Sequence, residues 1–316
     1  TLWAELPEKK GLDVINRANA EAYIGFLASD ALEGREAGFR GGRIAGEYIV
    51  SNLKTMGIEP LFESYYQPFE AYNKERQKKG RFQVHPDSIA KLKQGVHQKL
   101  SMNNILGKIE GKNPNEYVII GAHYDHLGFD PMLDGDRVYN GADDNASGVS
   151  AVLQVAKAFL ATGVQPERTV IFAFWDGEEK GLLGSKYFVQ TFLEMDKVKG
   201  YLNYDMIGRN KDESKPMHVV YFYTEAHPVF GDWLKNDIKK YGLNLTPDYR
   251  PWDKPVGGSD NASFALLDIP VIWYHTDGHP DYHMPSDHVE KINWNKIVDI
   301  TKASFLNMWN LAKEID

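Results

Sequence analysis

Short apolar runs alternate with longer stretches of helical spacing from about residue 101 onward. The apolar runs predict strands at Asn104–Ile109, Tyr117–Ala122, Thr169–Trp175, Gly200–Tyr204, His218–Tyr223 and Ile269–Tyr274. The stretches between and after them predict helices at Ala146–Thr162, Leu182–Leu193, Pro228–Tyr241, Asn261–Leu267 and Asn293–Ala312. Strands that alternate with helices are typical of a sheet covered on both faces. We therefore predict an α/β fold with a mostly parallel central mixed sheet that carries helices on both faces.

The first hundred residues have a different texture. Helical spacing of apolar positions predicts helices at about 14–28 and 43–56. The segment 60–100 is rich in Tyr, Lys and Gln, lacks a clear long period, and predicts short strands with a small helix after Pro86. Its basic run, Lys74–Arg81, favours a solvated face over a binding patch.

Length and charge limit the possible functions. A chain of 316 residues can bury a sizeable core, and we expect one domain over residues 1–316 with an insertion at about 60–100. Lysine and arginine number 36 against 44 aspartates and glutamates, so the formal net charge of −8 argues against a nucleic-acid partner. No apolar run approaches the roughly 18–20 residues that span a bilayer, so we expect no membrane partner. A monomer or a small homo-oligomer is expected.

The chain contains no cysteine, which excludes disulfides, thiolate zinc sites and a cysteine nucleophile. It begins at Thr1 instead of Met, and Thr1–Lys10 does not have the pattern of a signal peptide. A mature chain trimmed of an export signal fits this start, and so does a chain shortened for another reason. We expect a secreted or periplasmic protein.

Residues that bind metal ions follow several of the strand-like runs. Five such positions stand near strand ends or in the turn that follows: His123, Asp143, the pair Glu178–Glu179, Asp205 and His283. Ligands of open α/β sheets bind beyond the carboxyl ends of the strands, so we expect these side chains to converge. Carboxylates and imidazoles from several different strands predict a polynuclear metal site, and with it a metal-dependent hydrolase.

The motif His123-Tyr124-Asp125 also has an ordinary structural explanation, a histidine satisfied at a strand end. If His123 binds a metal through one ring nitrogen, a carboxylate is expected at the other, and Asp125 is the candidate for that supporting contact. His126 should point to the opposite side if the strand geometry continues.

Paired acidic residues occur twice. Capping of the following helix explains one acidic residue of Asp143–Asp144, but adjacent carboxylates repel each other unless a cation lies nearby. The pair Glu178–Glu179 at a helix start is favourable dipole chemistry in many proteins. Adjacent residues there point in different directions, however, so one carboxylate could bind a metal while the other acts as a general base.

Five motifs in order carry a family resemblance: HYDHLG (123–128), GADDNASG (141–148), DGEEKGLLGS (176–185), NYDMIG (203–208) and YHMPSDHVEKI (282–292). Together they resemble the signature set of the two-zinc aminopeptidases of the bacterial leucyl aminopeptidase type, over roughly residues 100–300. The resemblance implies a zinc-exopeptidase-like fold of the phosphorylase/hydrolase type, two Zn²⁺ per chain and a peptide substrate that loses its N-terminal residue. Manganese or cobalt would also suit nitrogen and oxygen ligands.

Carried over by position, the resemblance implies that Asp143 bridges both metals. His123 and Asp205 would complete one metal site, and Glu179 and His283 the other.

The resemblance further implies that Glu178 is the general base and that the peptide bond between Asp143 and Asp144 is cis. Four histidines, His275, His279, His283 and His288, fall in the last motif region. The Tyr-His-x-Pro-x-Asp order favours His283 as the ligand, with His279 as the main rival and His275 as a further one.

Three other functions stay open. A carboxypeptidase of the same metal chemistry would need basic residues for a terminal carboxylate, and Arg209 and Arg250 are candidates. A glutaminyl cyclase resembles this fold but works with one zinc, which the complete second ligand set argues against. A non-catalytic binding domain should have lost ligands, whereas this chain retains every position. Arg209, Tyr249, Trp252 and the loop Gly257–Asp260 are expected to line the substrate pocket.

Overall fold

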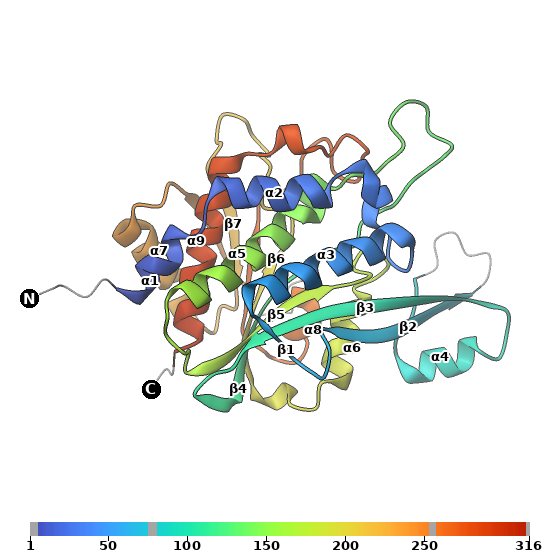
Figure 1. Cartoon of the computed structure of the whole chain (residues 1–316), viewed down its shortest axis with the longest axis horizontal. Coiled ribbons are helices and arrows are strands. Elements are labelled where there is room, and N and C mark those ends of the chain that lie inside the picture. The colour runs from blue at the N-terminus through green and yellow to red at the C-terminus, as the bar shows by residue number, and fades with distance from the viewer. Residues whose placement is uncertain (1–5, 75–80, 253–256, 314–316) are drawn as a thin grey trace, which may run out of the picture.

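A mixed sheet runs through the centre of the molecule (Figure 1). The structure is a computed structural model that describes residues 6–74, 81–252 and 257–313. Within these ranges nine strands form the sheet: β1 (Glu59–Pro60), β2 (Tyr66–Lys74), β3 (His97–Ile109), β4 (Asn113–His123), β5 (Arg168–Trp175), β6 (Val198–Tyr204), β7 (His218–Tyr223), β8 (Thr246–Pro251) and β9 (Val271–His275).

The strand order is β1-β3-β5-β4-β6-β9-β7-β8, and β2 pairs with β3 beside this path. The four central neighbours β5, β4, β6 and β9 are parallel. Antiparallel pairs flank them, because β3 runs against β5 and β7 runs against β9. The predicted mixed α/β sheet is therefore confirmed, and its parallel part is the centre together with the β7–β8 pair.

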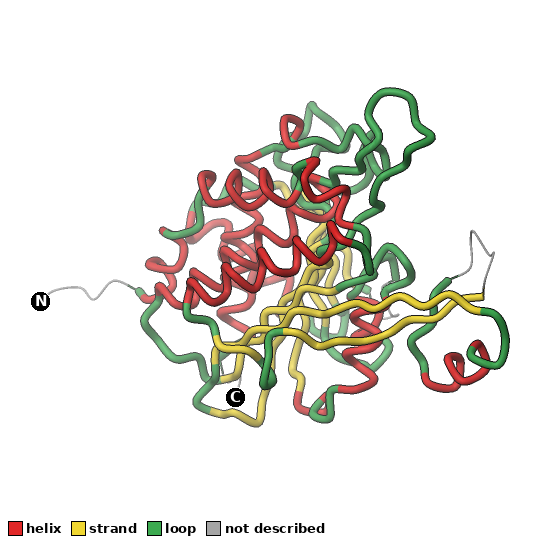
Figure 2. The backbone as a smooth tube through the Cα atoms, turned by 45° about the vertical axis from the view of Figure 1, so that its right-hand side comes forward, coloured by secondary structure: helices red, strands yellow, loops and turns green. Residues whose placement is uncertain are grey.

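Helices cover both faces of the sheet (Figure 2). The described α-helices are α1 (Pro7–Asp13), α2 (Arg17–Leu27), α3 (Arg40–Met56), α4 (Pro86–Leu92), α5 (Gly148–Ala161), α6 (Leu183–Thr191), α7 (Val229–Tyr241), α8 (Asn261–Ala265) and α9 (Trp294–Leu311). Buried side chains of α1, α2, α3, α5, α7 and α9 form one core cluster against the sheet, and those of α6 and α8 belong to a second cluster on the other face. None of the described helices is both long enough and apolar enough to cross a membrane.

Strand β5 illustrates why the centre of the sheet reads as an uninterrupted apolar run. Every residue of β5 is buried. Alternate side chains point to opposite faces of a strand. Accordingly Val170, Phe172 and Phe174 belong to one core cluster, whereas Ile171, Ala173 and Trp175 belong to the other. A strand with helices on both faces needs apolar residues at every position.

The segment 60–100 forms a long β2–β3 hairpin with α4 beside it, and the hairpin extends to one side of the molecule (Figure 1). The helix after Pro86 is confirmed, but the prediction of short strands is wrong, since β3 alone has 13 residues. The outer half of β3 is largely exposed, so it carries no apolar run that marks a strand. Most of the basic run Lys74–Arg81 lies outside the described residues, as do the first five residues of Thr1–Lys10.

Candidate metal centre

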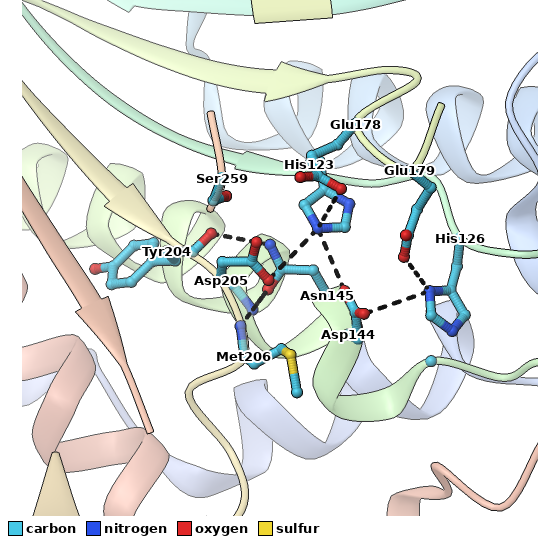
Figure 3. A network of polar contacts seen from close by, with 12 residues as sticks. His123, His126, Asp144, Asn145, Glu178, Glu179, Tyr204, Asp205, Met206 and Ser259 are labelled. Atoms are coloured by element: carbon cyan, nitrogen blue, oxygen red, sulfur yellow. Dashed lines mark hydrogen bonds and ion pairs between the residues drawn. The ribbon is translucent and has the colours of Figure 1, made fainter. Parts of the chain in front are cut away.

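Four of the predicted site residues, His123, Glu178, Glu179 and Asp205, meet at the carboxyl ends of the parallel strands (Figure 3). His123 is the last residue of β4, Asp205 follows the last residue of β6, and Glu178 and Glu179 lie in the turn after β5. The register places His123 beside Trp175 and Ala122 beside Tyr204, so these three strands end at one level. Asp144 reaches the same point from the turn Ala142–Ser147, which leads into α5.

One group of ligand atoms surrounds the imidazole of His123. Its Nε2 lies 3.3 Å from Oδ1 of Asp144, 3.6 Å from Oδ1 of Asp205 and 3.8 Å from Oε2 of Glu178. This nitrogen is buried and makes no hydrogen bond within the described part of the chain. A buried imidazole nitrogen that faces carboxylate oxygens without bonding to them is what a metal site requires, and nitrogen with oxygen donors suits zinc.

A second group lies on the other oxygen of Asp144. Nε2 of His283 is 3.2 Å from Oδ2 of Asp144 and 3.1 Å from Oε2 of Glu179. The two carboxylate oxygens of Asp144 therefore face different groups of donors, His123 with Asp205 on one side and Glu179 with His283 on the other. This arrangement fits two metal ions that share one carboxylate.

His126 joins the second group, and the prediction that it points away is wrong. Its Nδ1 lies 2.8 Å from Oε1 of Glu179 and 3.9 Å from Oδ2 of Asp144. The atoms of His126, Asp144 and Glu179 lie close enough together to hold an ion by themselves. Strand β4 ends at His123, so the alternation of side chains does not continue to residue 126.

Asp143, which the sequence predicts as the bridging ligand, does not lie between the two groups; Asp144 does. Oδ1 of Asp143 accepts a hydrogen bond from the backbone N–H of Gly208 at 2.6 Å. Its Oδ2 lies 2.9 Å from Nε2 of His279. Both oxygens are thus used away from the centre. The cis peptide bond joins Asp144 to Asn145, one position later than predicted.

The carboxylate of Asp287 holds the turn in the orientation in which Asp144, and not Asp143, faces the two ligand groups. Its oxygens accept the backbone N–H groups of both Asp143 and Asp144, at 3.0–3.1 Å. The turn is thereby anchored through two consecutive amides, and the two side chains that follow them lead to different partners. His279 is occupied by Asp143, so it is not a rival of His283 at the centre. His275 lies 2.6 Å from the backbone oxygen of Asp205 through its Nδ1.

Asp125 supports three of the predicted site residues at once. Its Oδ1 accepts the backbone N–H of Glu178 at 3.0 Å, and its Oδ2 accepts that of Glu179 at 3.2 Å. The expected carboxylate is 3.4 Å from Nδ1 of His123 at its Oδ1, whereas the hydrogen bond of Nδ1 is with the backbone oxygen of Asp125 at 3.1 Å. One fully buried carboxylate therefore fixes the turn after β5 relative to the end of β4. The contacts to the two glutamates are not visible in the sequence.

The crowded carboxylates shift each other's ionisation. Burial raises the pKa of Glu178 well above its ordinary value; His123 acts against this, and the charges of Asp205 and Glu179 add to it. Burial also acts to raise the pKa of Asp144, but His123, His126 and His283 together hold that pKa well below its ordinary value. The site therefore contains one carboxyl group that favours its proton beside another that favours its charge. Such a pair suits acid–base work at a metal centre.

Two further buried acids lie near the site: Asp260, which belongs to the loop predicted to line the pocket, and Asp176, for which no role was predicted. Burial raises the pKa of both Asp176 and Asp260 to about 7. Asp176 accepts the hydroxyl hydrogen of Tyr124 at 3.0 Å, and Asp260 accepts that of Ser185 at 2.5 Å. Asp176 is the first residue of the DGEEKGLLGS motif, and its place in that motif is the signal by which the sequence could have pointed to it.

A pocket of about 280 Å³ opens onto the centre. Its lining combines the acidic residues with apolar and aromatic ones: Asp144, Glu178, Glu179, Asp205, Met206, Gly258, Trp273, His275, Gly278, Tyr282 and His283. Of the residues predicted to line it, only Gly258 of the loop 257–260 does so. Arg209 instead lies 2.7 Å from Asp281, and Arg250 pairs with Asp248 and Asp277.

Comparison with known proteins places this geometry in a family. Leupeptin-inactivating enzyme 1 of Streptomyces exfoliatus is 34% identical over 170 residues, which cover 53% of this chain and 34% of that protein. An aminopeptidase of Pseudomonas aeruginosa is 38% identical over 115 residues, covering 36% of this chain and 19% of its own length. This chain thus spans about a third of one relative and about a fifth of the other.

The fold has a solved counterpart in a zinc aminopeptidase from Bacillus subtilis, with a TM-score of 0.73 and 16% sequence identity, over 96% of this chain and 97% of that one. At this level of identity the likeness establishes the fold. The sequence model of Peptidase family M28 matches residues 104–307, which is more than half of the chain and includes all five motifs. The resemblance found in the sequence is therefore confirmed, and the chain belongs to Peptidase family M28.

Proposed function

We propose that the protein is a zinc-dependent aminopeptidase that holds two zinc ions per chain. The observation that carries this proposal is the position of Asp144, whose Oδ1 faces His123 and whose Oδ2 faces His283. Asp205 would complete the first site, and Glu179 the second, with His126 close to Glu179. When bound, zinc supplies Lewis-acid polarisation of the scissile carbonyl and lowers the pKa of a coordinated water.

Glu178 is the proposed general base. Its Oε2 lies 3.8 Å from Nε2 of His123, in the group of His123, Glu178 and Asp205 whose atoms are close enough to hold an ion, and the family resemblance assigns it the role of base at this site. The backbone N–H that it donates to Asp125 fixes its orientation. From this place the carboxylate would take a proton from the attacking water and later deliver it to the leaving amine.

The state of two arginines disfavours a carboxypeptidase. A carboxypeptidase needs a basic side chain for the terminal carboxylate. The two arginines considered for that role, Arg209 and Arg250, are already paired with aspartates. The presence of two ligand groups likewise disfavours a cyclase that works with one zinc.

Metal analysis combined with a peptide panel tests the proposal. The purified protein is analysed for zinc, manganese and cobalt after desalting, and is then assayed on matched peptides with free, acetylated and pyroglutamyl-forming N-termini. Two equivalents of zinc with release of the first residue from free N-termini alone would support the proposal. Cleavage of acetylated peptides from the C-terminus, or cyclisation with one equivalent of zinc, would contradict it. Secretion and oligomeric state stay predictions, which fractionation of the source cells and analytical ultracentrifugation would test.

A further inference from the structure

Arg35, in the first part of the chain, is buried beside the candidate metal centre with every guanidinium hydrogen in use. Its exposed fraction is 1%. Nε donates to the backbone oxygen of Tyr124 at 2.9 Å. One terminal nitrogen donates to the oxygens of Leu27 and Asn140 at 2.6 and 2.7 Å. The other donates to those of Gly141 and Asp144 at 3.1 and 3.4 Å. A guanidinium has five N–H donors, and here five carbonyl oxygens accept them.

Three of these carbonyls, those of Tyr124, Gly141 and Asp144, belong to two segments that carry ligands of the first metal group. Tyr124 lies between His123 and Asp125, at the exit of β4. Gly141 directly precedes the turn Ala142–Ser147, and Asp144 within that turn carries the shared carboxylate. One planar side chain therefore bonds to the backbone of both ligand-bearing segments.

The backbone around Arg35 strengthens the same connection. The oxygen of Arg35 accepts the N–H of His126 at 3.1 Å, and the oxygen of Gly34 accepts that of Gly128 at 3.0 Å. A methyl group added at Gly34 would come within 2.1 Å of the oxygen of Gly128, so the two backbones are in close contact. The side chain of Glu36 continues to the turn after β5, where it lies 2.8 Å from Nζ of Lys180.

The chemistry of this position requires arginine. A buried charge is tolerated only when its donors are satisfied, and lysine has three donors on a single nitrogen that cannot reach five separated carbonyls. The positive charge also lies near the carboxylates of Asp144, Asp287, Asp125 and Glu179, which interact favourably with it. Arg35 stands outside the residues 104–307 that match the family model, so the match itself gives it no role.

We propose that Arg35 is a positioning residue of the metal centre, which holds the exit of β4 and the Asp144 turn at the separation where His123 and Asp144 bind one ion. The inference rests on the proposed zinc site, but it concerns metal affinity and so does not depend on which peptide is cleaved. It predicts that the arginine contributes to zinc binding although it touches no zinc.

The test compares Arg35→Lys with the matched control Arg168→Lys. Arg168 is also buried and donates to Glu116 and to the backbone oxygen of Leu311, but it lies at the start of β5, at the opposite end of the strand from the site. Zinc dissociation constants are measured by competition with a chromogenic chelator on the whole chain. Supporting groups of metal ligands typically affect affinity about 10–100-fold. We expect a loss of that size in Arg35→Lys, together with a smaller rise of the unfolding temperature on adding zinc, and no change of zinc affinity in Arg168→Lys.

Unchanged zinc affinity in a folded Arg35→Lys variant would overturn the inference alone, whereas absence of zinc binding by the wild-type protein would overturn the proposed function with it. Hydrogen exchange on the wild-type chain provides a second measurement that needs no variant. If Arg35 couples to the centre, zinc should slow exchange in residues 33–36 by a factor similar to that in 123–128. Exchange in 33–36 that does not respond to zinc, while 123–128 does, would contradict the proposal.

Discussion

Nε2 of His279 lies 2.9 Å from Oδ2 of Asp143, and both side chains are fully buried. Both residues were candidate metal ligands in the sequence. In the structure they contact each other, and Asp144, the residue after Asp143, faces the centre instead. The pair acts as a support for the turn that presents Asp144. Variants of adjacent residues can therefore separate support of the turn from binding of the metal.

The substitutions Asp143→Asn and Asp144→Asn should have opposite effects on zinc binding. Asp143→Asn keeps an oxygen for the N–H of Gly208 and should retain both zinc ions, while losing about 1–3 kcal/mol of stability because the buried contact with His279 is weakened. Asp144→Asn removes the charge and one of the two oxygens that face the ions, so it should lose zinc. Elemental analysis after desalting, with thermal unfolding of both variants, checks this. Zinc loss in Asp143→Asn with retention in Asp144→Asn would restore the original assignment.

Glu178→Gln should abolish most of the turnover without loss of zinc. General base catalysis contributes about 10²–10⁴-fold, and the amide cannot accept the proton. The neighbouring substitution Glu179→Gln is the control, since Oε2 of Glu179 lies 3.1 Å from His283 in the second group and its loss should release metal. Steady-state kinetics and metal analysis of both variants are compared. Full activity in Glu178→Gln would refute its role as the base.

The substitutions His283→Ala and His279→Ala should also separate zinc binding from support of the turn. His283→Ala should lose the second zinc ion and keep a folded chain, because its side chain is partly exposed and its ion pairs are with Asp144 and Glu179. His279→Ala should retain zinc but lose roughly 3–5 kcal/mol of stability, the usual effect of leaving one buried charge without its partner. Zinc stoichiometry and denaturant unfolding distinguish the two. Two zinc ions in His283→Ala and fewer in His279→Ala would show that His279 binds zinc and that His283 does not.

The buried carboxyl group of Asp237 in α7 should make stability depend on pH. Burial raises the pKa of Asp237 to about 6; Lys240 and Lys313 act against this and Glu8 adds to it. The folded chain holds this proton more tightly than the unfolded chain, so stability is highest below about pH 4 with respect to this group and is lost as the pH rises through about 6.

Asp237→Asn should therefore unfold at a temperature about 2–4 °C higher than the wild type at pH 8, a gain of about 1–2 kcal/mol after allowance for solvent screening. At pH 4 the two proteins should be equal. The exposed Asp232 on the same helix provides the control substitution, Asp232→Asn. Equal unfolding temperatures of wild type and Asp237→Asn at pH 8 would contradict the prediction.

The elements that bury residues on two faces were predictable from local pattern. The inner part of β4, residues 117–122, and most of β5 are apolar because both faces are covered, and α7 was predicted to within one residue at its start. Strand β8 was missed because it lies at the sheet edge, where its residues are only partly buried and their polarity carries no strand signal. The hairpin partner of β2 was underestimated for the same reason.

The sequence by itself determined the family, the donor types and the convergence of His123, Glu178, Glu179 and Asp205, since these follow strands whose parallel order brings their ends together. Tertiary structure alone decided between Asp143 and Asp144, turned His126 toward Glu179, and brought Arg35 to the carbonyls of both metal-binding segments. Asp143 and Asp144 are neighbouring residues of the same type, so local sequence does not distinguish them. Which of them faces the site depends on hydrogen bonds with Asp287, Gly208 and His279, residues that are distant in the chain and meet the turn only in the folded protein.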